Sequence, residues 1–265
     1  MNSIRNFLPF SFTKFPKFLI YLFIIYLIFP SVIINVVEGT EVYINYTYSG
    51  DTGPRFWHLL EGSSEICECG KNQSPIDLTS EDIKNLAPPP YPNFTDITDV
   101  EALNNGHTVE CCSDDMSKIN IKIEGKLYTL AQFHFHTPSE HRINGKYFDV
   151  EQHLVFENED GINAVVSVLY DLSTKNSTFL DPIISNLPKI CNETKKLDKV
   201  ELLSLVHDLN SLSQTYSYSG SLTTPPCTEG VTWFVNVKPL NIGMQQLLEL
   251  RQVTGFNSRY TQTRH

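Results

Sequence analysis

The chain has 265 residues, 41% of them hydrophobic, and a formal net charge of −10 at pH 7. This acidic balance excludes a nucleic-acid partner, which would require a basic face. When an N-terminal targeting segment is set aside, about 226 residues remain, enough for a single large domain.

Residues 1–39 have the composition of a targeting segment. Basic residues precede an apolar run from Phe18 to Val37, and small residues suited to cleavage follow at Val37-Glu38-Gly39. This pattern predicts a signal peptide. The alternative is an uncleaved signal anchor, because about 20 apolar residues can span a bilayer. In either case we expect the domain, residues 40–265, to be secreted, extracellular or in an endomembrane lumen.

Sequons and cysteines agree with export. A sequon at Asn72 precedes Ser74-Pro75, and we expect it to be unused. The six cysteines, an even number, suit an oxidising compartment. A cysteine zinc site is the alternative, but the spacing from Cys67 to Cys112 matches no zinc-finger pattern. Four further Asn-x-Ser/Thr sequons are predicted glycosylation sites: Asn45, Asn93, Asn176 and Asn192.

The first part of the domain predicts loops and short strands. Gln73–Leu78 has the pattern of a loop entering a short strand, and the proline-rich Ala87–Pro92 that of a surface loop. Asn104-Asn105-Gly106 predicts a turn before a strand. Ile119–Leu130 alternates around Glu124-Gly125, which indicates a hairpin.

Two segments rich in histidine follow. In Gln132-Phe133-His134-Phe135-His136, alternation places Gln132, His134 and His136 on one face and both phenylalanines on the other. Asn144-Gly145 is a strong hairpin-turn signal before Glu151-Gln152-His153. If these two residues form the turn, His153 lies opposite His136 and diagonal to His134. Pro138 can interrupt this ladder, so the register is a hypothesis.

Three imidazoles that converge on one face are the ligand set of a catalytic zinc with an open fourth position. Gln132 and Glu151 each lie two residues before a histidine and on its face, where partners of ligand imidazoles belong. The alternative is an incidental His-x-His pair on a strand.

The remaining elements complete the predicted fold. Ala164–Tyr170 predicts a strand buried on both faces, and Val231–Val237 a further strand. Apolar spacing predicts a short helix within Leu197–Leu212 and an amphipathic helix over Asn241–Val253. Strands outnumber helices, so we expect a mainly β, α+β domain. It would hold one large, twisted, mostly antiparallel central sheet with a few short peripheral helices.

Four motifs resemble those of the α-class carbonic anhydrases, and the similarity extends from about Tyr48 to Gln262. The resemblance implies a zinc enzyme for the reversible hydration of carbon dioxide to bicarbonate and a proton, by attack of zinc-bound hydroxide. The expected small-molecule partners are then carbon dioxide and bicarbonate. We expect a monomer with no obligate protein partner. The motifs are Gln132-Phe133-His134-Phe135-His136, Ser139-Glu140-His141, Glu151-x-His153-Leu154-Val155 and Ser221-Leu222-Thr223-Thr224-Pro225-Pro226-Cys227.

The resemblance also implies roles for single residues. The zinc ligands would be His134, His136 and His153, with a carbonyl near Asn257 holding His136 in place. Thr223 would accept a hydrogen bond from the hydroxide and donate its own proton to Glu140. Because a carboxylate can only accept, the threonine hydroxyl must then be an acceptor toward the zinc. The apolar carbon dioxide pocket would be lined by Val155, Val165, Leu222, Thr224 and Trp233.

Further implied roles concern the proton and the cysteines. His107 matches the proton-shuttle position, and an ordinary histidine pKa near 6.5 suits that task. Tyr48 and Asn105 match residues that order the waters between metal and shuttle. Cys67 would form a disulfide with Cys227, although Cys69 is a close competitor. The remaining cysteines have no assignment: Cys111, Cys112 and Cys191.

The chain departs from the family's pattern at three positions. Glu110 stands where a neutral polar side chain is frequent, and we expect it to retune proton transfer. Tyr260 replaces the usual proline and Phe156 a common histidine, and we expect neither to remove activity. A carbonic-anhydrase-like binding domain without catalysis is an alternative, but such domains typically lack one of the three histidines. Hydrolysis of activated esters is a weaker alternative.

Overall fold

The protein is described by a computed structural model over residues 45–63, 65–86 and 90–264. The predicted signal peptide, residues 1–39, lies outside this range, as do residues 40–44 of the predicted domain. Within the described residues, no helix is long and apolar enough to cross a membrane.

Short helices and longer strands alternate along the described chain. The α-helices are α2 (Ile66–Cys69), α3 (Asp181–Ile184), α4 (Leu202–Asp208) and α5 (Met244–Thr254). The strands are β1 (Asp77–Leu78), β2 (Tyr91–Asn93), β3 (Ile97–Asn104), β4 (Val109–Cys112), β5 (Asn120–Ile123), β6 (Lys126–His136), β7 (Arg142–Ile143), β8 (Val150–Glu157), β9 (Asn163–Ser173), β10 (Thr194–Val200), β11 (Thr215–Ser221) and β12 (Glu229–Gly243).

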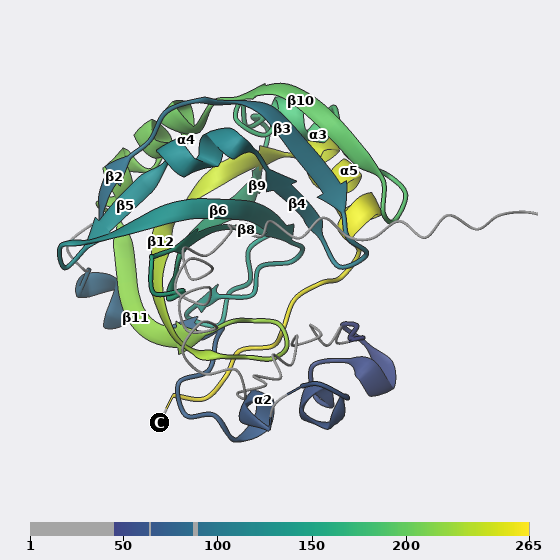
Figure 1. Cartoon of the computed structure of the whole chain (residues 1–265), viewed down its shortest axis with the longest axis vertical. Helices are drawn as coiled ribbons and strands as arrows, with labels where there is room; N and C mark the ends of the chain where they lie inside the picture. Colours follow the sequence, from purple (N-terminus) through teal and green to yellow (C-terminus); the bar gives the residue numbers. More distant parts are fainter. Residues whose placement is uncertain (1–44, 64, 87–89, 265) are drawn as a thin grey trace, which may run out of the picture. The chain divides into compact units, whose positions relative to one another are not determined.

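Ten of these strands form one central sheet. Its main order is β10-β3-β4-β6-β8-β9-β12-β11. In addition, β5 pairs with β6, and β2 pairs with β5. All neighbours are antiparallel except β9 and β12, which run parallel. Figure 1 shows β6 and β8 in the middle of the sheet, with α3, α4 and α5 in the upper half of the view. The predicted fold class is therefore confirmed, with one parallel pair in the sheet.

The central strands bury both of their faces. On β6, Phe133 and Phe135 are fully buried in a core that also contains residues of α3, α4 and α5. On β9, Val166 joins the same core, whereas Val165 joins a second core on the opposite face together with Trp233. The prediction that β9 is buried on both faces is confirmed. The histidines of β6 therefore face the side away from the helices.

The predicted register between β6 and β8 is wrong by two residues. His134, not His136, lies opposite His153, and His136 lies opposite Glu151. The Asn144-Gly145 turn does form, because Ile143 bridges Lys146, but β7 then pairs with β1 instead of continuing the ladder. The ladder resumes with a displacement of two. Since side chains alternate with a period of two, this displacement keeps all three histidines on one face.

The short helix predicted within Leu197–Leu212 is confirmed, because α4 covers Leu202–Asp208. Residues up to Val200 belong to β10, which pairs with β3. The pairing is interrupted at Asp99, whose φ is +49°, so apolar residues three apart, such as Leu197 and Val200, are both buried. This spacing imitates a helical period, so the apolar pattern begins in β10, before the helix itself.

Two other boundaries are also corrected. Asn241–Gly243 pair with β9 and belong to β12, so α5 begins only at Met244. Pro92, predicted in a loop, lies in β2, which pairs only with β5. Proline is tolerated there because an edge strand leaves N–H positions that no neighbour requires.

A disulfide joins Cys67 of α2 to Cys227, which follows the Thr223 turn, across a sequence separation of 160 residues. Both half-cystines are buried against Trp57. The pairing implied by the resemblance is confirmed, and the competitor Cys69 is a free, exposed thiol. The bond therefore ties the N-terminal segment of the domain to the turn that carries Thr223.

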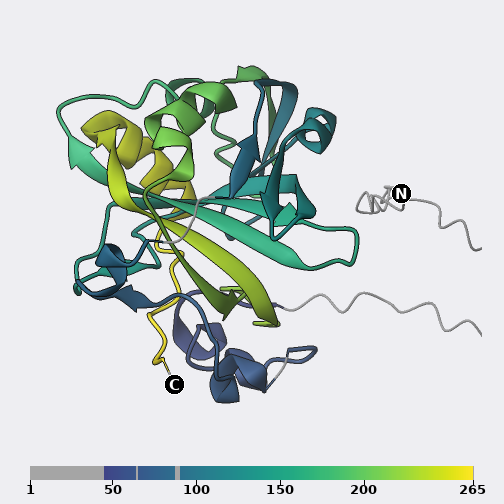
Figure 2. The same cartoon turned by 90° about the vertical axis from the view of Figure 1, so that its left-hand side faces the viewer.

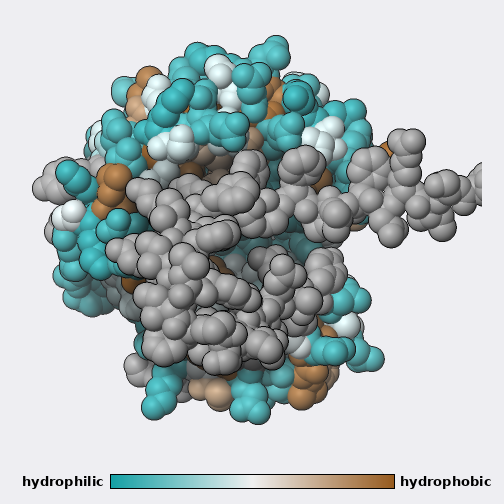
Figure 3. All heavy atoms as spheres, in the orientation of Figure 1, coloured by the Kyte–Doolittle hydropathy of each residue, from teal (hydrophilic) through white to brown (hydrophobic). Residues whose placement is uncertain are grey.

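The view in Figure 3 shows one face of the molecule. The described side chains on the face in Figure 3 are mainly hydrophilic, with scattered hydrophobic residues. The four predicted glycosylation sites are all exposed: Asn45, Asn93, Asn176 and Asn192.

Replacing both Cys67 and Cys227 with Ser should lower the free energy of unfolding by about 3–5 kcal/mol, because the unfolded chain then regains the entropy of an open long loop. Urea denaturation measures this change. Cys191→Ser, at an exposed free thiol, is the control and should shift stability by less than about 0.5 kcal/mol. Equal stability of the double variant and the parent would show that the bond does not stabilise the fold.

Candidate metal centre

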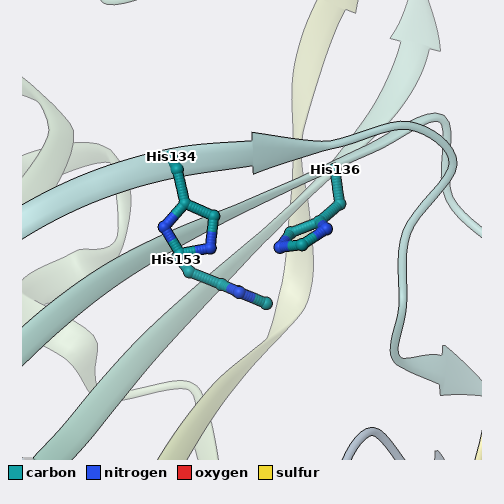
Figure 4. A group of neighbouring side chains, drawn as sticks. All are labelled: His134, His136 and His153. Atoms are coloured by element: carbon teal, nitrogen blue, oxygen red, sulfur yellow. The ribbon is translucent and has the colours of Figure 1, made fainter. Parts of the chain in front are cut away.

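Three histidine rings converge from adjacent strands (Figure 4). His134 and His136 extend from β6 and His153 from β8, and their ligand nitrogens lie within 4.8 Å of one another. His136 and His153 are each 1% exposed. The predicted cluster is therefore present despite the error in register.

Each ring is oriented by one hydrogen bond to an oxygen acceptor. Nδ1 of His134 donates to Oε1 of Gln132 at 2.8 Å, and Nδ1 of His136 donates to the Asn257 carbonyl at 2.7 Å. Nε2 of His153 donates to Oε1 of Glu151 at 2.7 Å. These acceptors fix the tautomers, so Nε2, Nε2 and Nδ1 respectively remain as lone-pair donors.

The site fits a zinc ion. Nε2 of His136 is buried and has no hydrogen-bond partner among the described residues, so its lone pair is available to a metal ion. Burial lowers the pKa of His134, His136 and His153, which keeps their imidazoles neutral and able to ligate. Three oriented neutral imidazoles leave the fourth tetrahedral position open, as a catalytic zinc requires.

Glu151 is the buried anchor beneath the site. Its Oε2 accepts the backbone N–H groups of Glu140 and His141 at 2.8 and 2.7 Å. Its Oε1 accepts from His141 Nδ1, His153 Nε2 and the Ser167 hydroxyl, at 2.6, 2.7 and 2.6 Å. Burial alone would raise the pKa of this carboxyl, but its interactions with His141 and His153 hold that pKa well below its usual range.

A polar chain behind Glu151 was missed by the sequence reasoning. His141 Nε2 lies 2.7 Å from the Tyr218 hydroxyl, which lies 2.8 Å from the Ser74 hydroxyl. The only available signal was that His141 directly follows Glu140 in a motif. Tyr218 and Ser74 lie far away in the sequence, and nothing there connects them to the site.

Glu140 is fully buried beside the histidines. Its Oε1 accepts the Arg259 N–H at 2.8 Å, and its Oε2 lies 3.6 Å from Nε2 of His136. The pKa of Glu140 is raised to about 7, chiefly by burial and also by Glu151, against the opposing effects of His153, the Thr223 hydroxyl and the Arg259 N–H. A divalent cation held by the imidazoles would favour the ionised carboxylate. Thr223 itself is buried.

Arg259 is another residue that sequence reasoning missed. Its side chain is 1% exposed, and its guanidinium donates to the carbonyls of Ser74 and Cys67 at 2.7 and 2.8 Å. Arg259 therefore connects Glu140, which accepts its backbone N–H, with the backbone of Cys67, a member of the disulfide.

The predicted pocket residues form an apolar wall. Val165 and Trp233 are buried, and the half-buried Val155 and Leu222 pack against them. The indole of Trp233 lies 4.9 Å from the His153 ring, between centroids. Thr224 is half-buried in the turn, and its carbonyl accepts the Cys227 N–H at 2.8 Å.

His107 lies in the turn between β3 and β4. Its half-buried ring stacks on Tyr46, with centroids 4.0 Å apart and planes 8° apart. Burial lowers its pKa. Oδ1 of Asn105 accepts the N–H of His107 at 3.0 Å, so Asn105 shapes the turn. Tyr48 hydrogen-bonds to Tyr46, and burial raises its pKa well above the usual value. Tyr46 was not identified from the sequence.

The C-terminal segment joins the His107 turn to β6. The Asn257 amide donates to the carbonyls of His107 and Phe135 at 3.0 and 2.8 Å, and its Oδ1 accepts the Thr137 N–H at 2.7 Å. Figure 2 shows this segment, in yellow, leaving α5 and running down the domain.

Comparisons with known proteins agree with this geometry. The family profile described as eukaryotic-type carbonic anhydrase matches residues 52–264. A carbonic anhydrase of Klebsiella pneumoniae is 35% identical over 205 residues, which cover 77% of this chain and 80% of the relative. Alpha carbonic anhydrase 4 of Arabidopsis thaliana is 33% identical over 244 residues, 90% of this chain and 89% of the relative.

A solved structure is similar as well. The alpha-carbonic anhydrase from Thermovibrio ammonificans, in complex with the inhibitor sulfanilamide, superimposes with a TM-score of 0.77 at 34% identity. The match covers 84% of this chain and 96% of that chain.

The fold, the histidine cluster and these matches define a β-sheet lyase with a three-histidine site. The chain belongs to the eukaryotic-type, or alpha, carbonic anhydrase family. It is accordingly an enzyme of carbon dioxide hydration, with carbon dioxide and bicarbonate as substrate and product.

Glu151→Gln should lower zinc affinity about 10–100-fold, because an amide cannot accept all five hydrogen bonds that orient His153 and its surroundings. Competition with a chelator measures the affinity. Glu157→Gln makes the same chemical change at the exposed end of β8 and should leave the affinity unchanged. A Glu151→Gln protein that folds and binds zinc like the parent would contradict the assignment.

Proposed function

We propose that the protein is an exported zinc carbonic anhydrase whose ligands are His134, His136 and His153. One observation carries this proposal: three oriented, neutral imidazoles converge, and the buried Nε2 of His136 has no hydrogen-bond partner among the described residues. When bound, zinc supplies the Lewis acidity that makes hydroxide available from water near neutral pH as the nucleophile for carbon dioxide.

Thr223 and Glu140 would orient that nucleophile. An ionised Glu140 can only accept, so the Thr223 hydroxyl directs its proton to the carboxylate and its lone pairs to the reacting oxygen. The Arg259 N–H holds the other carboxylate oxygen of Glu140 in place. The hydroxide proton is thereby held at Thr223 Oγ1, and a lone pair is aimed at the substrate.

Carbon dioxide is apolar and would lie against the apolar wall. Val155, Val165, Leu222 and Trp233 offer no hydrogen bond on the surfaces that pack together. Such a surface excludes water from the attacked carbon but adds no strong hold on the charged product. The wall would therefore favour entry of carbon dioxide and departure of bicarbonate.

His107 would carry the released proton to solvent. It is half-buried between the interior and the surface, and Asn257 fixes its backbone beside the ligand strand. Because burial lowers its pKa, the neutral form that accepts a proton prevails down to a pH below about 6.5. The shuttle would thus remain effective in a mildly acidic lumen.

Export of the protein is supported by three observations. The Cys67–Cys227 disulfide suits an oxidising compartment. The four sequons are exposed, and the N-terminal residues have the composition of a signal peptide. We propose secretion or retention in an endomembrane lumen, with glycosylation at these sites.

The purified protein should contain about one zinc per chain and hydrate carbon dioxide rapidly. Stopped-flow hydration assays, with and without a chelator, together with metal analysis, test this expectation. Chelation should abolish the activity and added zinc should restore it. Folded protein that contains no zinc, or that stays active without it, would refute the proposed function.

His107→Ala should slow turnover by about 10–100-fold at low buffer concentration, because no side chain then exports the proton. Imidazole buffer should restore most of the rate. His207→Ala, in a side chain 91% exposed on α4, is the matched control and should behave like the parent. If imidazole does not accelerate the His107 variant, another group carries the proton.

A further inference from the structure

Glu110 lies on the face of the sheet that holds the histidine cluster. It belongs to β4, the neighbour of β6, and its position is directly opposite His134. Directly opposed residues of antiparallel strands project to the same face, with Cβ atoms about 5 Å apart. The carboxyl group of Glu110 and the His134 imidazole therefore share one side of the sheet.

The charge of Glu110 is not compensated. The side chain is half-buried, and among residues 45–63, 65–86 and 90–264 no cation forms an ion pair with it. Its hydrogen-bond partner is Sγ of Cys112, 3.6 Å away. Burial, followed by the charge of Glu110, raises the pKa of the Cys112 thiol to about 12. That thiol is thus a neutral, weak donor; its hydrogen bond lowers the pKa of the Glu110 carboxyl, which burial raises, and it adds no positive charge to offset the carboxylate.

Glu101 provides a useful contrast. It lies one strand further away, on β3, opposite Cys112. Its exposed carboxylate forms an ion pair with Lys196 at 3.5 Å. Two carboxylates of the same type thus lie near one another, but only Glu110 is both partly desolvated and adjacent to a histidine of the cluster.

We propose that Glu110 is a specificity-determining residue that lowers the affinity of the metal centre for small monovalent anions, bicarbonate included. This inference rests on the proposed zinc site. A partly buried carboxylate repels an anion at short range, and solvent and salt screen that repulsion poorly. Carbon dioxide carries no charge, so its binding is unaffected.

The charge of Glu110 would affect the binding of bicarbonate and of carbon dioxide differently. Bicarbonate, the charged product, is repelled, whereas the neutral substrate enters freely. Chloride and other small anions of an exported environment compete less for the same position. A unit negative charge close to the bound anion lowers the affinity for that anion by about tenfold.

The test uses the zinc-loaded protein and thiocyanate as the probe. Isothermal calorimetry should show that Glu110→Gln binds thiocyanate about tenfold more tightly than the parent. In dehydration assays the KM for bicarbonate should fall severalfold, whereas the KM for carbon dioxide in hydration stays the same. Glu110→Met, which also removes the charge but has a different shape, should tighten thiocyanate binding to a similar extent.

Glu101→Gln is the matched control and should change thiocyanate affinity by less than about twofold, because its charge is exposed and paired. Unchanged affinity in both Glu110 variants, or an equal gain in the Glu101 variant, would overturn the proposal. Zinc content and parental carbon dioxide hydration are measured in the same preparations. If the parent binds zinc and is active, a negative result refutes the role of Glu110 alone and leaves the proposed function standing.

Discussion

The candidate site depends on one fully buried carboxylate. Glu151 receives five hydrogen bonds, from two backbone N–H groups, two imidazoles and a serine hydroxyl. Its donors come from β8, β9 and the loop that carries Glu140, so a single side chain sets the relative positions of three segments. A buried carboxylate is tolerable only when its acceptor capacity is filled, which is why removal of any donor affects the others. The side chain of His153 and the backbone of Glu140 are therefore both positioned by the carboxylate of Glu151.

The sheet and the histidine cluster were predictable because both follow from a period of two. Gln132, His134 and His136 share a face whatever the pairing, and an even displacement of β8 leaves His153 on that face. The register itself was not predictable. It depends on β7 leaving the hairpin to pair with β1, a contact with residues more than 60 positions earlier in the chain. The exact start of α4 was not predictable either, because the interrupted pairing at Asp99 of the neighbouring strand gives β10 an apolar spacing that resembles a helical one.

Much of the surrounding network could not be read from the sequence. The side chains of His141, Tyr218 and Ser74 join segments separated by 77 and 144 residues. Arg259 donates to carbonyls 185 and 192 positions away. No local pattern encodes such contacts, because they arise only when loops pack together at the ends of the sheet. The resemblance to a family identified Glu140 and Thr223 as site residues, whereas the contacts of Tyr46, His141 and Arg259 are visible only in the structure.

The position of Asn257 in the chain has a consequence for biogenesis. Its backbone carbonyl orients His136, and its amide joins the His107 turn to β6. A chain is made and folds from its N-terminus, so both ligand strands exist well before this residue is synthesised. Until then, His136 lacks the acceptor that fixes its tautomer, and the His107 turn lacks its hydrogen bond to the Asn257 amide. Binding of the proposed zinc in the final geometry would therefore follow synthesis of the segment around residue 257, as a late step in maturation.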